Sequence, residues 1–426
     1  MRSSVLRKVR VGALAVAGVM AGAPAVVSAQ SLVIRGATVH TPAGPAQRAT
    51  IVIEDGRIAA VGTNVATPVG AAVIDAAGLH VYPGFFDAFS QLGLTEVSDV
   101  TVTNDFTELG EFNPHLQSYL AVHPSTEHIP VTRVGGITHA LTAPAARAGG
   151  VGGQASVISL DGWTVEEMLV SPSAGFVVTW PSLAGGGARP FDEVKREYDE
   201  RIRHMAQWLE DARRYDQAAQ ARQDVTRDLK LEAFSKVTRR ELPLLVRVDE
   251  ERYIRGAVAF AEEHKIRIVI VGGRQAWKAA QLLAEKNVPV ILGPTQALPS
   301  GPDERYDEQY AAPAILHKAG VRIAFGSFSS AYSRTLPFQA ANAVPYGLPH
   351  ETAVRAITVA GAEILGLADR VGTIERGKLA NLLITTGDPL EYQTEIRHVI
   401  IDGRDVGRAN RHLELYERYR SRPRGN

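Results

Sequence analysis

The sequence has 426 residues, of which 45% are hydrophobic, so it is long enough for one large domain and one small domain with substantial cores. Its 46 basic and 46 acidic side chains give no net charge, which argues against binding to nucleic acid or to an anionic membrane surface. Cysteine is absent, which excludes disulfides, thiolate nucleophiles and cysteine-ligated zinc.

The first thirty residues have the pattern of a secretory signal peptide. A cationic start precedes a mostly apolar stretch over residues 11–27, and Val27, Ser28 and Ala29 form a small-x-small cleavage site. We therefore expect residues 1–29 to be removed and the mature chain to be periplasmic or secreted. An uncleaved anchor is the competing interpretation, which the short, Ala- and Gly-rich apolar stretch disfavours. No later stretch has the roughly eighteen apolar residues that a membrane span needs.

Both ends of the remaining chain predict short strands and turns. Residues 32–39 and 49–62 alternate apolar and polar side chains, and Asp55-Gly56 between two such runs is a strong hairpin signal. Residues 398–406 contain a second Asp-Gly turn.

The middle of the chain alternates between strand-like and helix-like stretches. This alternation predicts a parallel sheet wrapped by helices, and a (β/α)₈ barrel is its natural closure. Residues 190–240 are an exception, because they are charged and lack strand signals; we expect amphipathic helices there, on the outside of the barrel. The predicted barrel strands are residues 79–87, 136–142, 155–160, 175–180, 242–248, 266–271, 288–292 and 321–325.

The first of these strands carries the most informative motif. It holds Pro83, Gly84 and Asp87 in a buried apolar setting. The stretch resembles the first barrel strand of the amidohydrolase superfamily, in which Pro-Gly-x-x-Asp-x-His-x-His supplies two metal-ligating histidines. In this chain the two histidine positions hold Phe89 and Gln91.

The resemblance implies a TIM (β/α)₈ barrel and a small β-sandwich that both chain ends build together. The sandwich would comprise residues 30–80 and 368–408, and the barrel residues 81–367 with the helical insertion 190–240. Residues 409–426 would form a C-terminal tail. The resemblance is strongest to imidazolonepropionase-like and dipeptidase-like branches, and it implies hydrolysis of non-peptide carbon–nitrogen bonds.

Other metal and catalytic positions of the family are substituted as well. Where relatives end a strand with histidine, this chain has Arg247, a permanent cation that repels a metal ion. Where the family has its catalytic Asp, it has Phe328. No His-x-His or His-Glu-x-x-His pair occurs, so we predict no metal cofactor. We also predict that the rings of Phe89 and Phe328 lie together where a metal would sit.

A polar set without metal ligands remains at the expected mouth of the barrel. Arg247 can grip a carboxylate through two parallel hydrogen bonds, or it can pair internally with an acidic neighbour, Asp87 or Asp249. The candidate binding residues are Asp87, Gln91, His139, Arg247, Asp249 and Ser327.

We therefore predict a degenerate amidohydrolase that binds a small, anionic molecule or supports an active relative in a hetero-oligomer. The alternative is an active exported amidohydrolase. It would work either with a zinc site rebuilt from His139 and Asp87 or without a metal.

Overall fold

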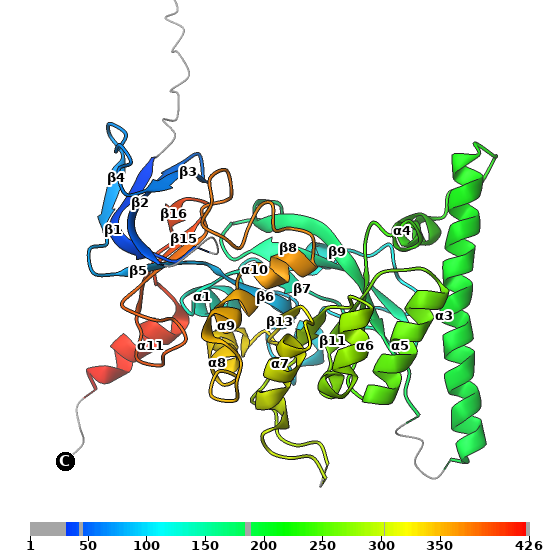
Figure 1. Cartoon of the computed structure of the whole chain (residues 1–426). Coiled ribbons are helices and arrows are strands. Elements are labelled where there is room, and N and C mark those ends of the chain that lie inside the picture. The colour runs from blue at the N-terminus through cyan, green and yellow to red at the C-terminus, as the bar shows by residue number, and fades with distance from the viewer. Residues whose placement is uncertain (1–30, 42–45, 184–188, 302, 423–426) are drawn as a thin grey trace, which may run out of the picture.

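The computed structural model describes residues 31–41, 46–183, 189–301 and 303–422 of the chain (Figure 1). It contains two eight-stranded sheets, a small one at one side and a larger one that is nearly closed into a barrel. The predicted signal peptide, residues 1–29, lies outside the described residues. Within the described part, no helix is both long and apolar enough to cross a membrane.

The small sheet joins the two ends of the chain. β5 pairs antiparallel with β14, which places Tyr82 opposite Leu383, a residue 301 positions later in the sequence. The strand order is β16-β15-β14-β5-β1-β2-β3, with β4 beside β1. Alternate apolar residues of these strands, such as Ile34 and Ile51, share one buried core. The strands are β1 (Leu32–Val39), β2 (Gln47–Glu54), β3 (Arg57–Gly62), β4 (Ala72–Asp75), β5 (His80–Pro83), β14 (Leu382–Thr385), β15 (Ile396–Ile401) and β16 (Arg404–Asp405).

The larger sheet confirms the predicted barrel. Its strands follow one another in chain order from β6 to β13, and the sequence predicts a strand at each of these places. They are β6 (Phe85–Ser90), β7 (Ile137–Thr142), β8 (Val151–Ser159), β9 (Leu169–Thr179), β10 (Leu244–Val248), β11 (Ile268–Gly272), β12 (Val290–Leu292) and β13 (Ile323–Phe325).

One strand of the barrel departs from the expected parallel arrangement. β8 is antiparallel to both β7 and β9, whereas the other neighbouring pairs are parallel. The reason is the connection from β7 to β8, residues 143–150, which is too short to hold a crossover helix. β8 therefore begins at the end of the barrel where the other strands finish, the end that we call the mouth.

Alternation along the strands separates the inside of the barrel from the outside. Leu245, Val269 and Ile291 fill the interior, while their neighbours face the helices. At the end opposite the mouth, side chains of α10 (Val359–Ile364) pack into the same interior cluster. The barrel is thus a packed core with free space at its mouth.

Helices cover the barrel on its outer side (Figure 1). Successive helices follow successive strands along the chain, as α5 follows β10 and α6 follows β11. The helices are α1 (His128–Arg133), α2 (Val165–Met168), α3 (Phe191–Gln220), α4 (Leu229–Thr238), α5 (Glu251–Glu263), α6 (Ala280–Glu285), α7 (Glu308–Lys318), α8 (Leu336–Ala341), α9 (His350–Ala356), α10 and α11 (Arg411–Arg420), with short 3₁₀ turns at Thr101–Thr103, Ser118–Ala121, Ala276–Ala279 and Ser333–Thr335.

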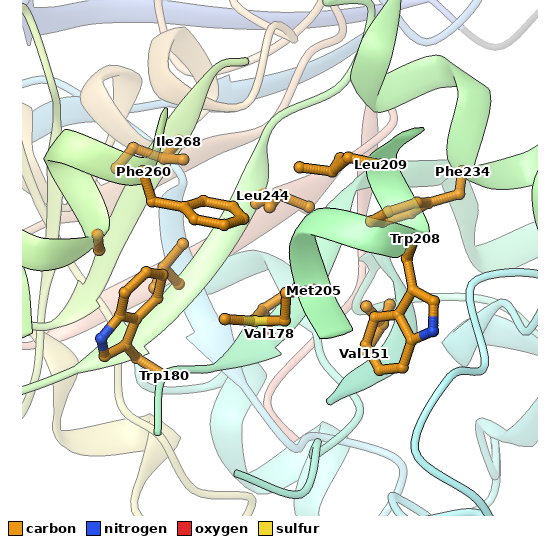
Figure 2. Close-up of a pocket in the computed structure, with 12 residues that line it drawn as sticks. Val151, Val178, Trp180, Met205, Trp208, Leu209, Phe234, Leu244, Phe260 and Ile268 are labelled. Carbon is orange, nitrogen blue, oxygen red and sulfur yellow. The ribbon is translucent and has the colours of Figure 1, made fainter. Parts of the chain in front are cut away.

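α3 is a 30-residue helix that stands along one edge of the molecule (Figure 1). Met205, Trp208 and Leu209 anchor its middle against the barrel and α4. Figure 2 shows these side chains around a void of about 10 Å³ whose lining is apolar. A space of this size without polar partners does not hold water, so it is a small packing defect rather than a ligand site.

Candidate functional site

A cavity of about 470 Å³ opens at the mouth of the barrel. Its walls come from residues that end or follow β9, β10, β11 and β12, and from α5 and α7. Working residues of such barrels lie at this end because the strand-to-helix loops meet there. The lining includes Ala146, Thr179, Trp180, Ser182, Arg247, Asp249, Glu250, Tyr253, Arg274, Pro294, Gln309 and Phe328.

Arg247 is the central cation of this cavity. It shares the inward face of β10 with Leu245, because alternate residues of a strand face the same side. Its guanidinium carbon lies 5.9 Å from the centre of the Phe89 ring, a cation–π distance. Burial lowers the pKa of Arg247, and the negative charge of Asp249 opposes that shift.

No ion pair within 4.0 Å and no hydrogen bond joins this guanidinium to another part of the chain that the structure describes. The internal pair with Asp87 or Asp249 that the sequence leaves open is therefore not formed. The guanidinium nitrogens are not among the buried, unpartnered atoms of the described residues, so they face the open cavity, where a cation without a fixed counter-ion can attract an anion. The cavity presents this unmet charge to whatever enters it.

Thr179 lies beside Arg247. The two residues are paired in the register of β9 and β10, and both line the cavity. The Thr179 hydroxyl oxygen is buried and has no hydrogen-bond partner among the described residues. The strand register brings a hydroxyl and a guanidinium to neighbouring positions of the cavity wall, and these two donor types suit an oxygen anion.

Two phenyl rings lie close to Arg247: Phe328 lines the cavity, and Phe89 is buried beside it. The centroids of Phe89 and Phe328 are 4.8 Å apart, with ring planes tilted by 32°, so the predicted contact is confirmed. Phe328 has a φ of +57°, a left-handed conformation that is rare for a bulky residue. A hydrogen bond from the Phe328 N–H to the Phe89 carbonyl oxygen, 2.9 Å long, helps to hold it there.

Asp87 and Ser327 do not reach the cavity, because they form the seam where β6 meets β13. Asp87 is fully buried and accepts hydrogen bonds from the Ser327 N–H at 2.9 Å, the Ser333 hydroxyl at 2.6 Å and the Phe89 N–H at 3.3 Å. Burial raises the pKa of Asp87 to about 6, and these hydrogen bonds oppose the shift. Both residues therefore serve barrel closure.

His139 lies at the opposite end of the barrel from Arg247. It faces inward near the start of β7, where its ring stacks on Phe86 at 6.1 Å. Its Nδ1 is 3.0 Å from the Thr138 hydroxyl, and its Nε2 is 3.4 Å from the side-chain nitrogen of Asn381. Burial lowers the pKa of His139 to about 3, so the ring is neutral. The structure thus places His139 away from the mouth.

Gln91 also stands apart from the cavity lining. Its backbone carbonyl oxygen accepts hydrogen bonds from the Ser330 hydroxyl, at 2.5 Å, and from the Leu94 N–H. Of the six candidates from the sequence, Arg247 and Asp249 line the cavity and the other four lie elsewhere.

The side chains at the mouth do not fit a catalytic metal. Three or more His, Asp or Glu ligands are needed, and in the described part of the chain no three such side chains converge. The seam Asp87 and the distant His139 use their polar atoms for structure, so they do not combine into the zinc site that the alternative interpretation requires.

Several residues that line the cavity are not among the candidates from the sequence. Thr179 could have been found, because it lies in the predicted strand 175–180, two residues after the inward-facing Val177. Tyr253 and Gln309 come from helices, and no local pattern marks their contribution.

Comparison with known proteins agrees with this fold. The model of the Amidohydrolase family matches residues 226–406. An amidohydrolase from Thermotoga maritima MSB8 superposes with a TM-score of 0.78 at 28% identity, covering 89% of this chain and 100% of that one. The class follows from the TIM-like barrel, from the attached sheet that both chain ends build, and from these matches. The chain belongs to the amidohydrolase superfamily.

Curated relatives point to the same superfamily. Amidohydrolase tasK of Hapsidospora irregularis is 24% identical over 374 residues, which is 79% of this chain and 37% of that protein. The imidazolonepropionase of Porphyromonas gingivalis is 32% identical over 126 residues, or 29% of this chain and 27% of that enzyme. The chain therefore spans well under half of the length of the curated relatives that it matches.

Proposed function

We propose that this chain is an exported amidohydrolase-superfamily barrel that binds a small organic anion at its mouth and does not carry out metal-dependent hydrolysis. The observation that carries the proposal is Arg247, a mostly buried cation in an open cavity, next in the strand register to Thr179, whose hydroxyl has no partner among the described residues. The substituted positions Phe89 and Phe328 support it, because the Phe328 ring lines the cavity and the Phe89 ring packs against it, close to that cation.

A carboxylate is the anion that this donor set suits best. The guanidinium fork matches the two oxygens of a carboxylate, and the Thr179 hydroxyl can donate to one of them. The apolar part of the lining, which includes Trp180 and Phe328, suits a short hydrocarbon part attached to the carboxylate.

Calorimetric titration of the purified chain with pentanoate tests the proposal. We expect Arg247→Met, which keeps the length of the side chain and removes its charge, to weaken binding by roughly 10- to 150-fold, the value of hydrogen bonds to a charged group. Arg255→Met is the matched control, since Arg255 is an exposed cation on α5 outside the cavity; it should leave the affinity unchanged.

Two results would contradict the proposal. One is equal pentanoate affinity in the wild type and Arg247→Met, or no binding in either. The other is about one tightly bound zinc or manganese ion per purified chain, because the side chains described at the mouth provide no ligand set for it.

A further inference from the structure

The charges around the cavity do not all remain available to a ligand. Four charged side chains line it: Arg247, Asp249, Glu250 and Arg274. Arg274 is paired with Glu304, at 2.7 Å between Nη2 and Oε1. Glu250 is paired with Arg252 at 3.0 Å. Arg247 and Asp249, one of each sign, are the two lining charges that no ion pair neutralises within the described residues.

Asp249 stands at the rim while Arg247 lies deeper. Asp249 is exposed, and the one hydrogen bond that its carboxylate accepts in the described part comes from the Arg274 backbone N–H at 3.3 Å. The two residues are two positions apart where β10 leaves the barrel, which separates their backbones by about 7 Å. Their charged groups are more than 4.0 Å apart, because they form no ion pair. The cavity therefore has a cationic interior and an anionic rim.

Resting on the proposed function, we infer that the ligand is a zwitterion whose carboxylate and ammonium groups are separated by a short carbon chain. The carboxylate binds Arg247 and Thr179, and the ammonium binds Asp249. The carbon chain lies along the aromatic and apolar wall, which includes Trp180, Tyr253 and Phe328. An α-amino acid does not match this arrangement, because its ammonium and carboxylate groups are attached to the same carbon and no carbon chain separates them.

Four probes of similar size test this inference by calorimetric titration. 5-Aminopentanoate carries both charges at a distance, pentanoate carries the anion, pentylamine carries the cation, and norvaline is the isomer with both charges on one carbon. We expect 5-aminopentanoate to bind about two- to fivefold more tightly than pentanoate, the range typical of an exposed ion pair. Norvaline should bind no better than pentanoate, and pentylamine more weakly than either.

Substitution of the rim carboxylate gives the second arm. Asp249→Asn should reduce the affinity for 5-aminopentanoate to that for pentanoate, and it should strengthen pentanoate binding slightly, because the rim carboxylate no longer repels the anion. Glu251→Gln is the matched control, because Glu251 is a neighbouring carboxylate that does not line the cavity. Asp249→Ser provides a second variant, with folding of each checked by circular dichroism.

The outcomes separate this inference from the proposed function. If pentanoate binds through Arg247 but 5-aminopentanoate gains nothing from Asp249, or if norvaline binds best, the zwitterion inference is overturned and the anion site stands. If no carboxylate binds, the proposed function itself fails. A preference for 5-aminopentanoate that disappears in both Asp249 variants supports the inference.

Discussion

Each end of the barrel interior holds one ionisable side chain that is mostly or fully buried. The two side chains differ in charge and in their hydrogen-bond partners. His139 is neutral and has polar neighbours at both ring nitrogens. Arg247 keeps its charge and has no such partner among the described residues. A satisfied polar group stabilises the fold, whereas an unsatisfied one at an open cavity is available for binding. The two side chains therefore have different roles: His139 stabilises the fold, and Arg247 is available to a ligand.

The largest expected effect concerns Asp87, the buried acid at the seam where β6 meets β13. Its pKa is raised to about 6 from an ordinary value of 3.8, so the folded state disfavours its ionised form. The stability that this group contributes is full below about pH 4 and is lost as the pH rises through 6. The shift corresponds to about 3 kcal/mol.

The Asp87→Asn variant isolates that effect, because it cannot titrate there. Urea unfolding of both proteins from pH 4 to pH 7 should show the wild type losing up to about 3 kcal/mol relative to the variant. A difference between the two proteins that does not change with pH would rule out this account of the seam.

A moderate effect is expected at the structural end of the interior. His139→Leu removes the ring nitrogens that neighbour Thr138 and Asn381, and so leaves the side-chain nitrogen of Asn381 without its partner among the described residues. We expect the free energy of unfolding to fall by about 1–3 kcal/mol, with carboxylate affinity unchanged. Urea unfolding and pentanoate titration measure the two quantities. If His139→Leu instead lost pentanoate binding and kept its stability, His139 would belong to the binding site and not to the structural end of the interior.

The smallest expected effect is on stability at the cavity end of the interior. Arg247→Met removes a mostly buried charge that has no fixed partner among the described residues, so we expect the free energy of unfolding to stay the same or to rise by up to about 1 kcal/mol. The same variant should bind pentanoate more weakly, by the factor given above. Clear destabilisation in urea would instead indicate that Arg247 is part of the structure and would break the contrast with His139.

The sequence predicts the barrel well, because each strand is a short apolar run between turn signals. It also predicts the contact between Phe89 and Phe328, since the matching residues around each position place them at the two strands that close the barrel. Both predictions depend on local sequence patterns and on the known closure of a (β/α)₈ barrel, in which the first and last strands lie side by side.

The sequence does not give the depth of a side chain along the barrel axis. His139 and Arg247 both occupy inward-facing strand positions, yet they lie at opposite ends, because depth depends on strand stagger. The partners of Asp87 come from a segment some 240 residues away, so the sequence does not reveal its role in the seam either. The direction of β8 followed from the length of a loop, which strand patterns alone do not reveal.

The reversed direction of β8 has a practical consequence for protein engineering. Because β7 and β8 form a hairpin, their connection at the mouth, residues 143–150, links two neighbouring strands without an intervening helix. Ala146 in this connection lines the cavity, so the segment borders the cavity directly. Residues inserted beside Arg147, the exposed residue of the connection, would extend a loop next to the mouth, whereas Ala148 and Gly149 contact Arg201 of α3 and must stay in place. The barrel thus carries one grafting point beside its cavity.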